Sequence, residues 1–288
     1  MNPGITFDLV DVLIKRNTLR KLLAFCQGRA QSSFRIQLFL VGNTLIAERC
    51  EPSASMMLHG SVNSGFGHSF ERAFTRPHPG CEDSSGHHRV LQYDIGSMRC
   101  AVCFEVDVAY AEPGTPVDAG LEQLHGRSPH AGAPPAGVDS LGEPDAGQVQ
   151  AISRGNGTPQ SQVAEMKVSR QILEYAMPQM WFGRNHYHIQ GHRPNRSGLV
   201  TEVAVTKLPW ELVRWEQKPD IQLALRKLDA LLSQLKHVVT RTREKACVLV
   251  YDENAHPTLD LFACTSGRAA LPADIVKKFW GIWIHPVC

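Results

Sequence analysis

Three short segments of the chain carry acidic residues at spacings that suit metal-dependent chemistry. Glu71 follows an apolar residue, Glu105 and Asp107 are separated by one residue, and Glu165 and Lys167 are separated in the same way. In a β-strand, residues i and i+2 point to the same side, so each of the last two pairs should converge on one point. Two such strands side by side would form a carboxylate pocket with one ammonium group, which suits hard divalent cations and a phosphate.

A purely structural role is hardest to argue for Glu105 and Asp107. Their neighbours are the apolar residues of a strand, Val102, Phe104, Val106 and Val108. Two carboxylates on one face of an apolar strand are costly unless they are paired or bound to a metal. The remaining residues keep simpler alternatives, since Glu71 could be a solvated or capping carboxylate, and Glu165 with Lys167 could form only a cross-strand ion pair.

The composition is that of a globular protein. The 288 residues are 43% hydrophobic and 20% charged, with a formal net charge of +2, which neither requires nor excludes a nucleic-acid partner. We expect a single domain over 1–288 with one insertion. No apolar run is long enough to span a bilayer, and residues 1–11 do not resemble a signal peptide, so we expect the nucleus or the cytoplasm rather than secretion.

The stretch 112–160 differs from the rest of the chain. Pro and Gly make up 16 of its 49 residues, and it has no hydrophobic periodicity. Such a segment cannot bury enough apolar area to offset the entropy lost on ordering. We interpret it as a disordered insertion within the domain, because acidic segments lie on both sides of it and must meet for a site to exist.

Hydrophobic periodicity predicts an α/β (α+β) fold with a mixed central β-sheet flanked by helices. Helices are expected over 7–25, 70–74, 170–182, 221–239 and 271–280, the third disturbed by Pro178, and loops over 51–66. Strands are expected over 34–48 as a hairpin turning at Gly42-Asn43, over 88–110 as two strands turning near Gly96-Ser97, and over 164–169, 186–192, 198–207, 246–251 and 259–264.

The eight cysteines are scattered and are expected to be reduced. Cys100 and Cys103 form a CxxC pattern, but no second CxxC or HxxxH follows. In a strand, residues i and i+3 face opposite sides, so buried thiols are favoured over a zinc site.

Five motifs in order resemble the DXO-type decapping nucleases, which are relatives of the PD-(D/E)xK nucleases. That family has an N-terminal arginine, then Gly-Φ-x-Φ-Glu, Glu-Φ-Asp and Glu-Φ-Lys, and then a glutamine on the following helix. The resemblance runs from about residue 8 to 207, interrupted by 112–160. The matching segments are 15–23 with Arg16 at the arginine position, Gly67-His68-Ser69-Phe70-Glu71, Glu105-Val106-Asp107, Glu165-Met166-Lys167, 177–181 with Gln179, and 189–193 as the strand that follows.

The resemblance implies a function and a cofactor. It implies a metal-dependent RNA 5′-end hydrolase that removes incomplete or non-standard caps or 5′ pyrophosphate, perhaps with 5′→3′ exonuclease activity. A two-metal site with Mg²⁺ or Mn²⁺ is expected, because hard cations prefer oxygen ligands. Some members of the family bind a nuclear 5′→3′ exonuclease, so such a nuclease is a candidate partner beside the RNA 5′ end.

The resemblance also implies a role for each residue. Asp107 would bridge the metals, and the carboxylates of Glu71, Glu105 and Glu165 with the Met166 carbonyl would complete the shell. Three further residues would contact water or RNA. Lys167 would hold the attacking water or the scissile phosphate, and Gln179 would orient that water or phosphate. Arg16 would bind a backbone phosphate through its planar guanidinium group. Arg16 and Gln179 could instead be ordinary helix-surface residues.

Two other functions were considered. One is a catalytically degenerate member of the same family that only binds RNA or a nuclease partner. The other is isoprenoid chemistry, which also uses Mg²⁺ and pyrophosphate. Isoprenoid synthases carry DDxxD motifs on helices, which this sequence lacks.

Overall fold

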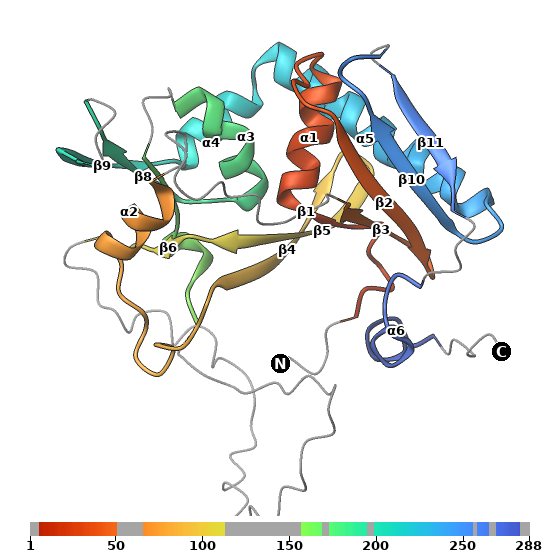
Figure 1. The fold of residues 1–288 in the computed structure, drawn as a ribbon, viewed down its shortest axis with the longest axis horizontal. Helices are drawn as coiled ribbons and strands as arrows, with labels where there is room; N and C mark the ends of the chain where they lie inside the picture. The colour runs from red at the N-terminus through yellow and green to blue at the C-terminus, as the bar shows by residue number, and fades with distance from the viewer. Residues whose placement is uncertain are drawn as a thin grey trace, which may run out of the picture.

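Two β-sheets organise the part of the chain that the computed structural model describes, which comprises residues 6–50, 66–112, 157–168, 173–194, 199–255, 258–264 and 269–282. The larger sheet has seven strands and the smaller one four. The larger sheet is built from β1 (Val12–Lys15), β2 (Phe34–Val41), β3 (Thr44–Arg49), β4 (His87–Ile95), β5 (Met98–Val106), β10 (Ala246–Tyr251) and β11 (Leu259–Ala263). Helices lie against both sheets (Figure 1), so the predicted mixed α/β fold is confirmed.

The larger sheet runs in the order β11-β10-β2-β3-β1-β5-β4. β1 lies in its interior and pairs in parallel with both β3 and β5, whereas the other neighbours are antiparallel. This position explains why the expected helix over 7–25 is wrong in its first half. Val12 and Ile14 are fully buried between the two parallel neighbours, and pairing on both edges outweighs local helical spacing.

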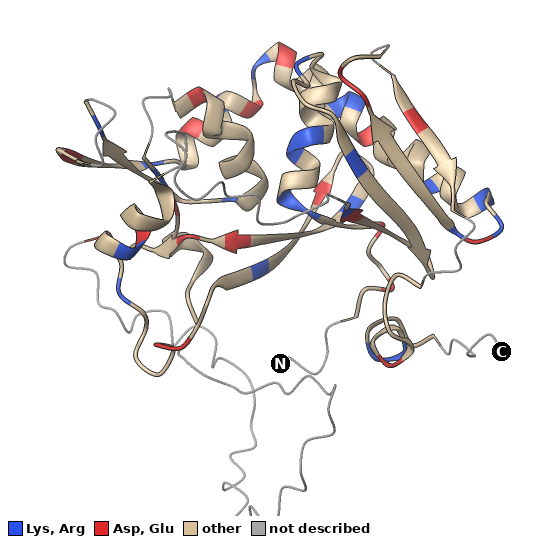
Figure 2. Cartoon of the chain, viewed as in Figure 1, with Lys and Arg blue, Asp and Glu red and all other residues tan. Residues whose placement is uncertain are grey.

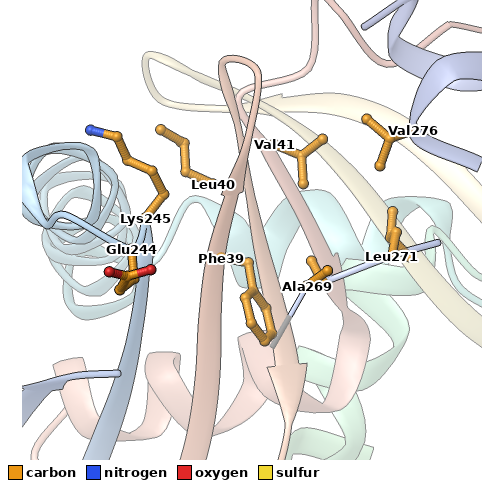
Figure 3. Close-up of a pocket in the computed structure, with 9 residues that line it drawn as sticks. Phe39, Leu40, Val41, Glu244, Lys245, Ala269, Leu271 and Val276 are labelled. Carbon is orange, nitrogen blue, oxygen red and sulfur yellow. The ribbon is translucent and has the colours of Figure 1, made fainter. Parts of the chain in front are cut away.

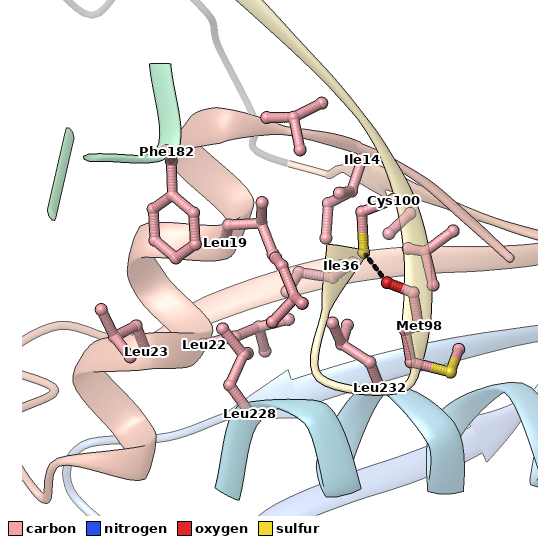
Figure 4. Close-up of a cluster of buried hydrophobic side chains, with 14 of the residues drawn as sticks. Ile14, Leu19, Leu22, Leu23, Ile36, Met98, Cys100, Phe182, Leu228 and Leu232 are labelled. Carbon is pink, nitrogen blue, oxygen red and sulfur yellow. Dashed lines mark hydrogen bonds between the residues drawn. The ribbon is translucent and has the colours of Figure 1, made fainter. Parts of the chain in front are cut away.

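One face of the larger sheet is covered by α1 (Arg16–Cys26) and α5 (Pro219–Arg241). Leucines of α1 meet leucines of α5 above the apolar residues of the sheet (Figure 4). Leu19, Leu22, Leu23, Leu228 and Leu232 are at most 1% exposed, and full burial of such a side chain contributes roughly 1.5–3 kcal/mol. This core fixes α1 against the sheet and thereby fixes the direction of the polar side chains that α1 carries.

The opposite face of the larger sheet carries a smaller core beneath α6 (Ala273–Trp280). Trp280 packs there and donates from Nε1 to the Thr44 hydroxyl at 2.8 Å. Beside α6 lies a hollow of about 120 Å³ (Figure 3). It is lined mainly by apolar groups, with Glu244 and Lys245 as its charged residues. It lies far from the acidic segments singled out in the sequence (Figure 1).

The smaller sheet is formed by β6 (Val108–Ala109), β7 (Val163–Val168), β8 (Tyr187–His192) and β9 (Glu202–Lys207), in that order. β7 and β8 are parallel and are connected through α3 (Leu173–Gly183). α3 packs against α1 and β5 in the core of the larger sheet and reaches β7 through Gln179. α2 (Gly67–Phe74) contacts β7 directly.

Most of the expected elements are confirmed within a few residues, including the hairpin turns at Gly42-Asn43 and near Gly96-Ser97. The sequence analysis missed α4 (Pro209–Glu216) and the short β6. It also placed all strands in one sheet, whereas the chain passes from the larger to the smaller sheet between β5 and β6. The interval 51–65 and nearly all of the proposed insertion at 112–160 lie outside the described residues.

The seven cysteines that the structure describes are unpaired. Cys100 lies in the core, where burial raises its pKa to about 12, as expected for an unreactive thiol. No helix among the described residues combines the length and the apolar character that crossing a bilayer requires.

Asp11 joins β5 and α5 to the start of β1, and we expect its removal to destabilise the fold. Its Oδ1 accepts from Lys236 Nζ at 2.7 Å and its Oδ2 from the Arg99 amide at 2.9 Å. Burial alone would raise the pKa of Asp11, but these donors hold it below its usual range. Asp11→Ala should lower the free energy of unfolding by about 1–2 kcal/mol at pH 7, as measured by urea denaturation.

The pH dependence of this loss follows from the sign of the shift. A carboxylate whose pKa is lowered in the folded state stabilises the protein above its unfolded pKa of about 3.9, and this stabilisation disappears as the pH falls through the folded value. The difference in stability between the two proteins should therefore shrink as the pH falls below about 3.9. Asp8→Ala is the control, because Asp8 is exposed and should change stability by less than about 0.5 kcal/mol.

Candidate functional site

Asp107 lies at the point where the chain passes from one sheet to the other. β5 ends at Val106 and β6 begins at Val108, and β6 pairs antiparallel with β7. This pairing brings the Asp107 carboxylate to β7, where its Oδ2 accepts from the Met166 amide at 2.9 Å. Figure 2 shows acidic positions at this junction and basic positions on α1. Residues on the two sides of the long intervening stretch thus lie next to each other.

Glu165 is the most enclosed charged group of this cluster. It is 0% exposed, and its two oxygens face different donors. Oε2 accepts from Arg16 Nη1 at 2.9 Å and from Asn185 Nδ2 at 3.4 Å. Oε1 accepts from the Lys167 ammonium and from the Gln179 amide. A buried carboxylate requires this degree of compensation, because an unpaired one would cost several kcal/mol.

The two neighbouring carboxyl groups have opposite pKa shifts. Burial and the adjacent Glu165 charge raise the pKa of Asp107 to about 7, and Lys167, 3.6 Å from Oδ2, only partly offsets them. Burial would also raise the pKa of Glu165, but Arg16 and Lys167 hold it below its usual range. The pair therefore holds one well compensated charge and one that is poorly compensated.

Arg16 begins α1 directly after β1 and is 8% exposed. Besides its ion pair with Glu165, it donates from Nη2 to the Glu105 carbonyl at 3.3 Å and lies over the Phe104 ring at 5.0 Å. The alternative of an exposed Arg16 on a helix surface is therefore wrong. Arg16 is buried against the strand that leads to Asp107.

Glu71 reaches the cluster through the packing of α2. Phe70, the preceding residue, is 3% exposed and packs on Gly191 of β8. A Cβ built on Gly191 would lie 2.9 Å from the Phe70 ring and 3.3 Å from Val168. The Glu71 charge contributes to the raised pKa of Asp107, and its carboxylate, 3.4 Å from His68 Nδ1, is 30% exposed. Gly191 thus allows the close approach that positions Glu71.

This close approach predicts that Gly191→Ala will be destabilising. The added methyl group must push α2 away from the sheet, and overpacking of this kind costs about 1–3 kcal/mol in free energy of unfolding. Gly67→Ala in the same helix is the control, because the nearest atom to its built Cβ is 4.0 Å away. Urea unfolding should rank Gly191→Ala well below Gly67→Ala, and equal stabilities would show that α2 is not held in this way.

Glu105 has a different environment from the other carboxylates. It is exposed, is paired in register with His88 of β4, and its Oε1 lies 3.0 Å from a Cβ built on Gly86. Within the described residues, no three His, Cys, Asp or Glu side chains converge closely enough to hold a metal ion. The structure thus brings Asp107, Glu165 and Lys167 into contact with Arg16 and Gln179, with Glu71 nearby and Glu105 at the margin.

Three residues of this region are not among the site residues that the sequence predicts. Asn185 donates to Glu165, and Arg20 donates to Gln179. His188 on β8 is paired in register with Glu165 on β7. It is 3% exposed, and its Nε2 has no hydrogen-bond partner among the described residues. Asn185 and His188 lie in none of the matching segments, and Arg20 lies in segment 15–23 at a position for which the resemblance implies no role. The i,i+4 spacing of Arg16 and Arg20 was the one usable signal, because it places both on one side of α1.

The donor set fits a hard divalent cation in its chemistry. Carboxylate and carbonyl oxygens are the groups that Mg²⁺ and Mn²⁺ prefer. The raised pKa of Asp107 reflects buried negative charge that the neighbouring lysine leaves incompletely balanced, and a bound cation would balance it.

The fold matches known structures from fungi. Rai1 of S. pombe in complex with 3′-FADP superimposes with a TM-score of 0.57 at 15% sequence identity, covering 90% of this chain and 73% of that chain. Rai1 of Candida albicans in complex with pU5-Mn²⁺ gives 0.60 at 14% identity, covering 94% and 75%. K. lactis Dxo1 in complex with manganese gives 0.53 at 9% identity, covering 94% and 69%.

These similarities define the class of fold, that of the Rai1 and Dxo1 proteins. At such low identities they establish the fold alone. A search of curated protein sequences gave no match. Residues 1–280 match the model of a family described as a domain of unknown function, DUF8563, and the chain belongs to this family.

Proposed function

We propose that this protein is a metal-dependent hydrolase acting on the 5′ end of RNA. The observation that carries the proposal is that Asp107, just before β6, meets Glu165 and Met166 of β7, with Lys167 hydrogen-bonded to Glu165 and within 3.6 Å of Asp107. Two acids and one lysine of this kind suit a cation and a phosphate. The similar fold of C. albicans Rai1, whose structure contains pU5 and Mn²⁺, supports this choice.

Each residue of the site would have a distinct task. Asp107, Glu165, Glu71 and the Met166 carbonyl would hold Mg²⁺ or Mn²⁺, and Glu105 would join them from the margin. Bound divalent cations would neutralise phosphate charge, activate water and stabilise the leaving oxygen. Lys167, Gln179 and Arg16 would act on the substrate. Lys167 would hold the water or the scissile phosphate, and Gln179 would position that water or phosphate. Arg16 would support Glu165 and face an RNA phosphate.

The substrates we propose are RNAs with a 5′ pyrophosphate linkage, namely triphosphorylated ends and incomplete or non-standard caps. Their anionic oxygens repel an incoming hydroxide, so a cation-holding carboxylate cluster beside cationic side chains addresses the main barrier to their hydrolysis. Progressive 5′→3′ cleavage and association with a 5′→3′ exonuclease, in the nucleus or the cytoplasm, belong to the same proposal.

The test is hydrolysis of short RNAs that carry a 5′-triphosphate, an unmethylated cap or a 5′-monophosphate, with Mn²⁺, with Mg²⁺ and with EDTA. We expect release of pyrophosphate or of the cap in the presence of metal and none with EDTA. Absence of cleavage of every substrate with both metals would refute the enzymatic function.

One observation favours a second candidate, a binding protein without catalysis. Glu165 already accepts hydrogen bonds from Arg16, Lys167, Gln179 and Asn185, so its lone pairs are engaged by the protein itself. Such a site would retain RNA and lose metal. Isothermal titration calorimetry with Mn²⁺ separates the two, since the enzyme should bind Mn²⁺ and the scaffold should not.

A further inference from the structure

Arg20 makes a contact that the sequence motifs do not explain. It lies one turn after Arg16 on α1 and is half-buried. Its Nη1 donates to Gln179 Oε1 on α3 at 2.8 Å. The other end of the same carboxamide, Nε2, donates to Glu165 Oε1. Gln179 is thus held between a cation on one side and a carboxylate on the other.

This arrangement permits one orientation of the amide. A guanidinium group has donors and no acceptor, so the atom facing Arg20 must be the carbonyl oxygen. An ionised carboxylate has acceptors and no donor, so the atom facing Glu165 must be the NH₂ group. The two neighbours therefore impose the same orientation on Gln179, although the oxygen and nitrogen ends of an amide have nearly the same shape.

We propose that Arg20 is a positioning residue that fixes Gln179 as a hydrogen-bond donor toward the candidate site. Of the two neighbours, Arg20 holds the amide permanently. A guanidinium group stays protonated at all accessible pH values. The Glu165 carboxylate is less available as an acceptor when a cation occupies its lone pairs, and the Arg20 contact then remains as the restraint.

The orientation determines what Gln179 can do. An NH₂ group directed at the site can donate to a phosphate oxygen or to the lone pair of a water molecule, and it cannot accept a proton from that water. Gln179 would therefore hold a reacting group in place and would not act as a base. This consequence for hydrolysis rests on the function proposed above, whereas the orientation itself does not.

The first experiment reads the amide directly and needs no activity. In protein labelled with [¹⁵N]glutamine, the side-chain NH₂ resonances of Gln179 are assigned by their loss in Gln179→Ala. We expect them to be shifted from those of exposed glutamines and to exchange slowly with water. Arg20→Met should shift them and speed their exchange with water, because the amide is then held by its bond to Glu165 alone, and Arg20→Lys, which retains a donor, should restore them in part.

The matched control is Arg214→Met, since Arg214 is 73% exposed and pairs with Glu211 on α4. It should leave the Gln179 resonances unchanged. Unchanged resonances in Arg20→Met, with an unfolding temperature equal to that of the wild type, would overturn the proposal.

The second experiment is a double-mutant cycle on hydrolysis of a 5′-triphosphorylated RNA. Arg20→Met should lower kcat about 10-fold with little change in KM, the range for loss of a supporting group. In the Gln179→Ala background the same substitution should have no further effect. A loss that persists there, or one confined to KM, would show that Arg20 contacts the substrate itself and would overturn the positioning role. If the wild type hydrolyses nothing, the proposed function fails, and the resonance experiment still decides the role of Arg20.

Discussion

Replacing Glu165 with glutamine should abolish hydrolysis and also destabilise the protein. The substitution keeps the shape of the side chain but removes the charge that Arg16 and Lys167 compensate. It also sets an amide NH₂ against groups that are all donors, which leaves buried donors unsatisfied at about 1–3 kcal/mol. We expect the free energy of unfolding to fall by that amount and the rate on 5′-triphosphorylated RNA to fall roughly 100- to 1,000-fold.

The control for this prediction is Glu174→Gln. Glu174 lies in the first turn of α3, is 55% exposed and pairs with Lys218 at the surface, where ion pairs contribute about 0–1 kcal/mol. Its substitution should change neither the rate nor the unfolding midpoint appreciably. If Glu165→Gln hydrolyses RNA at the wild-type rate, Glu165 is excluded from the catalytic site. If this variant is also destabilised, Glu165 serves only in a structural ion pair.

Asparagine in place of Asp107 should have the opposite effect on stability and the same effect on activity. In the absence of metal, the Asp107 carboxylate is a second buried negative charge beside Glu165. Asparagine can still accept from the Met166 amide, and it can donate to Glu165 without carrying a charge. We expect Asp107→Asn to be more stable than the wild type at pH 8 in EDTA, by on the order of 2 kcal/mol, while hydrolysis is lost.

The pH dependence follows from the direction of the shift. The pKa of Asp107 is about 7 in the folded protein and about 3.9 when unfolded, so the folded state binds more protons between these values. Wild-type stability should therefore fall as the pH rises from about 4 to 7. The advantage of Asp107→Asn should be largest at pH 8 and vanish near pH 4, in urea unfolding followed at several pH values.

Two comparisons make this prediction specific to the site. Asp94→Asn, at a position whose side chain is 67% exposed, should show no such pH-dependent gain. Adding Mn²⁺ should raise the unfolding temperature of the wild type, because a ligand that binds only the folded state stabilises it, and should raise that of Asp107→Asn much less. Equal responses to Mn²⁺ would argue against Asp107 as a ligand, and a destabilised Asp107→Asn would contradict the electrostatic argument.

Glu165→Gln and Asp107→Asn test the same idea, that the protein compensates the charges of these two carboxyl groups unequally. Asp107, just before β6, and Glu165, on β7, differ in how well their surroundings compensate charge. This difference predicts which of the two carboxyl groups the fold requires and which it only tolerates. A loss of activity in both variants with stability changes of opposite sign would be difficult to explain by structural roles alone. Groups that reduce stability are frequently retained where they serve function.

Local patterns in the sequence predicted most of the elements and failed at specific places. The α5 stripe and the hairpin turn at Gly42 could be recognised because helix periodicity and turn chemistry are properties of neighbouring residues. β1 was misassigned as helix, since its conformation depends on β3 and β5, which come later in the chain. The division into two sheets was missed for the same reason.

The sequence by itself determined the chemical character of the candidate site, because the residue types and their order along the chain suffice to suggest oxygen ligands, a lysine and a glutamine. Only the tertiary structure decided which of these groups meet. It buried Arg16 against Glu165, left Glu105 at the margin and added Arg20, Asn185 and His188. Such contacts depend on strand pairing and helix packing between segments far apart in sequence, and local patterns carry no record of these distances.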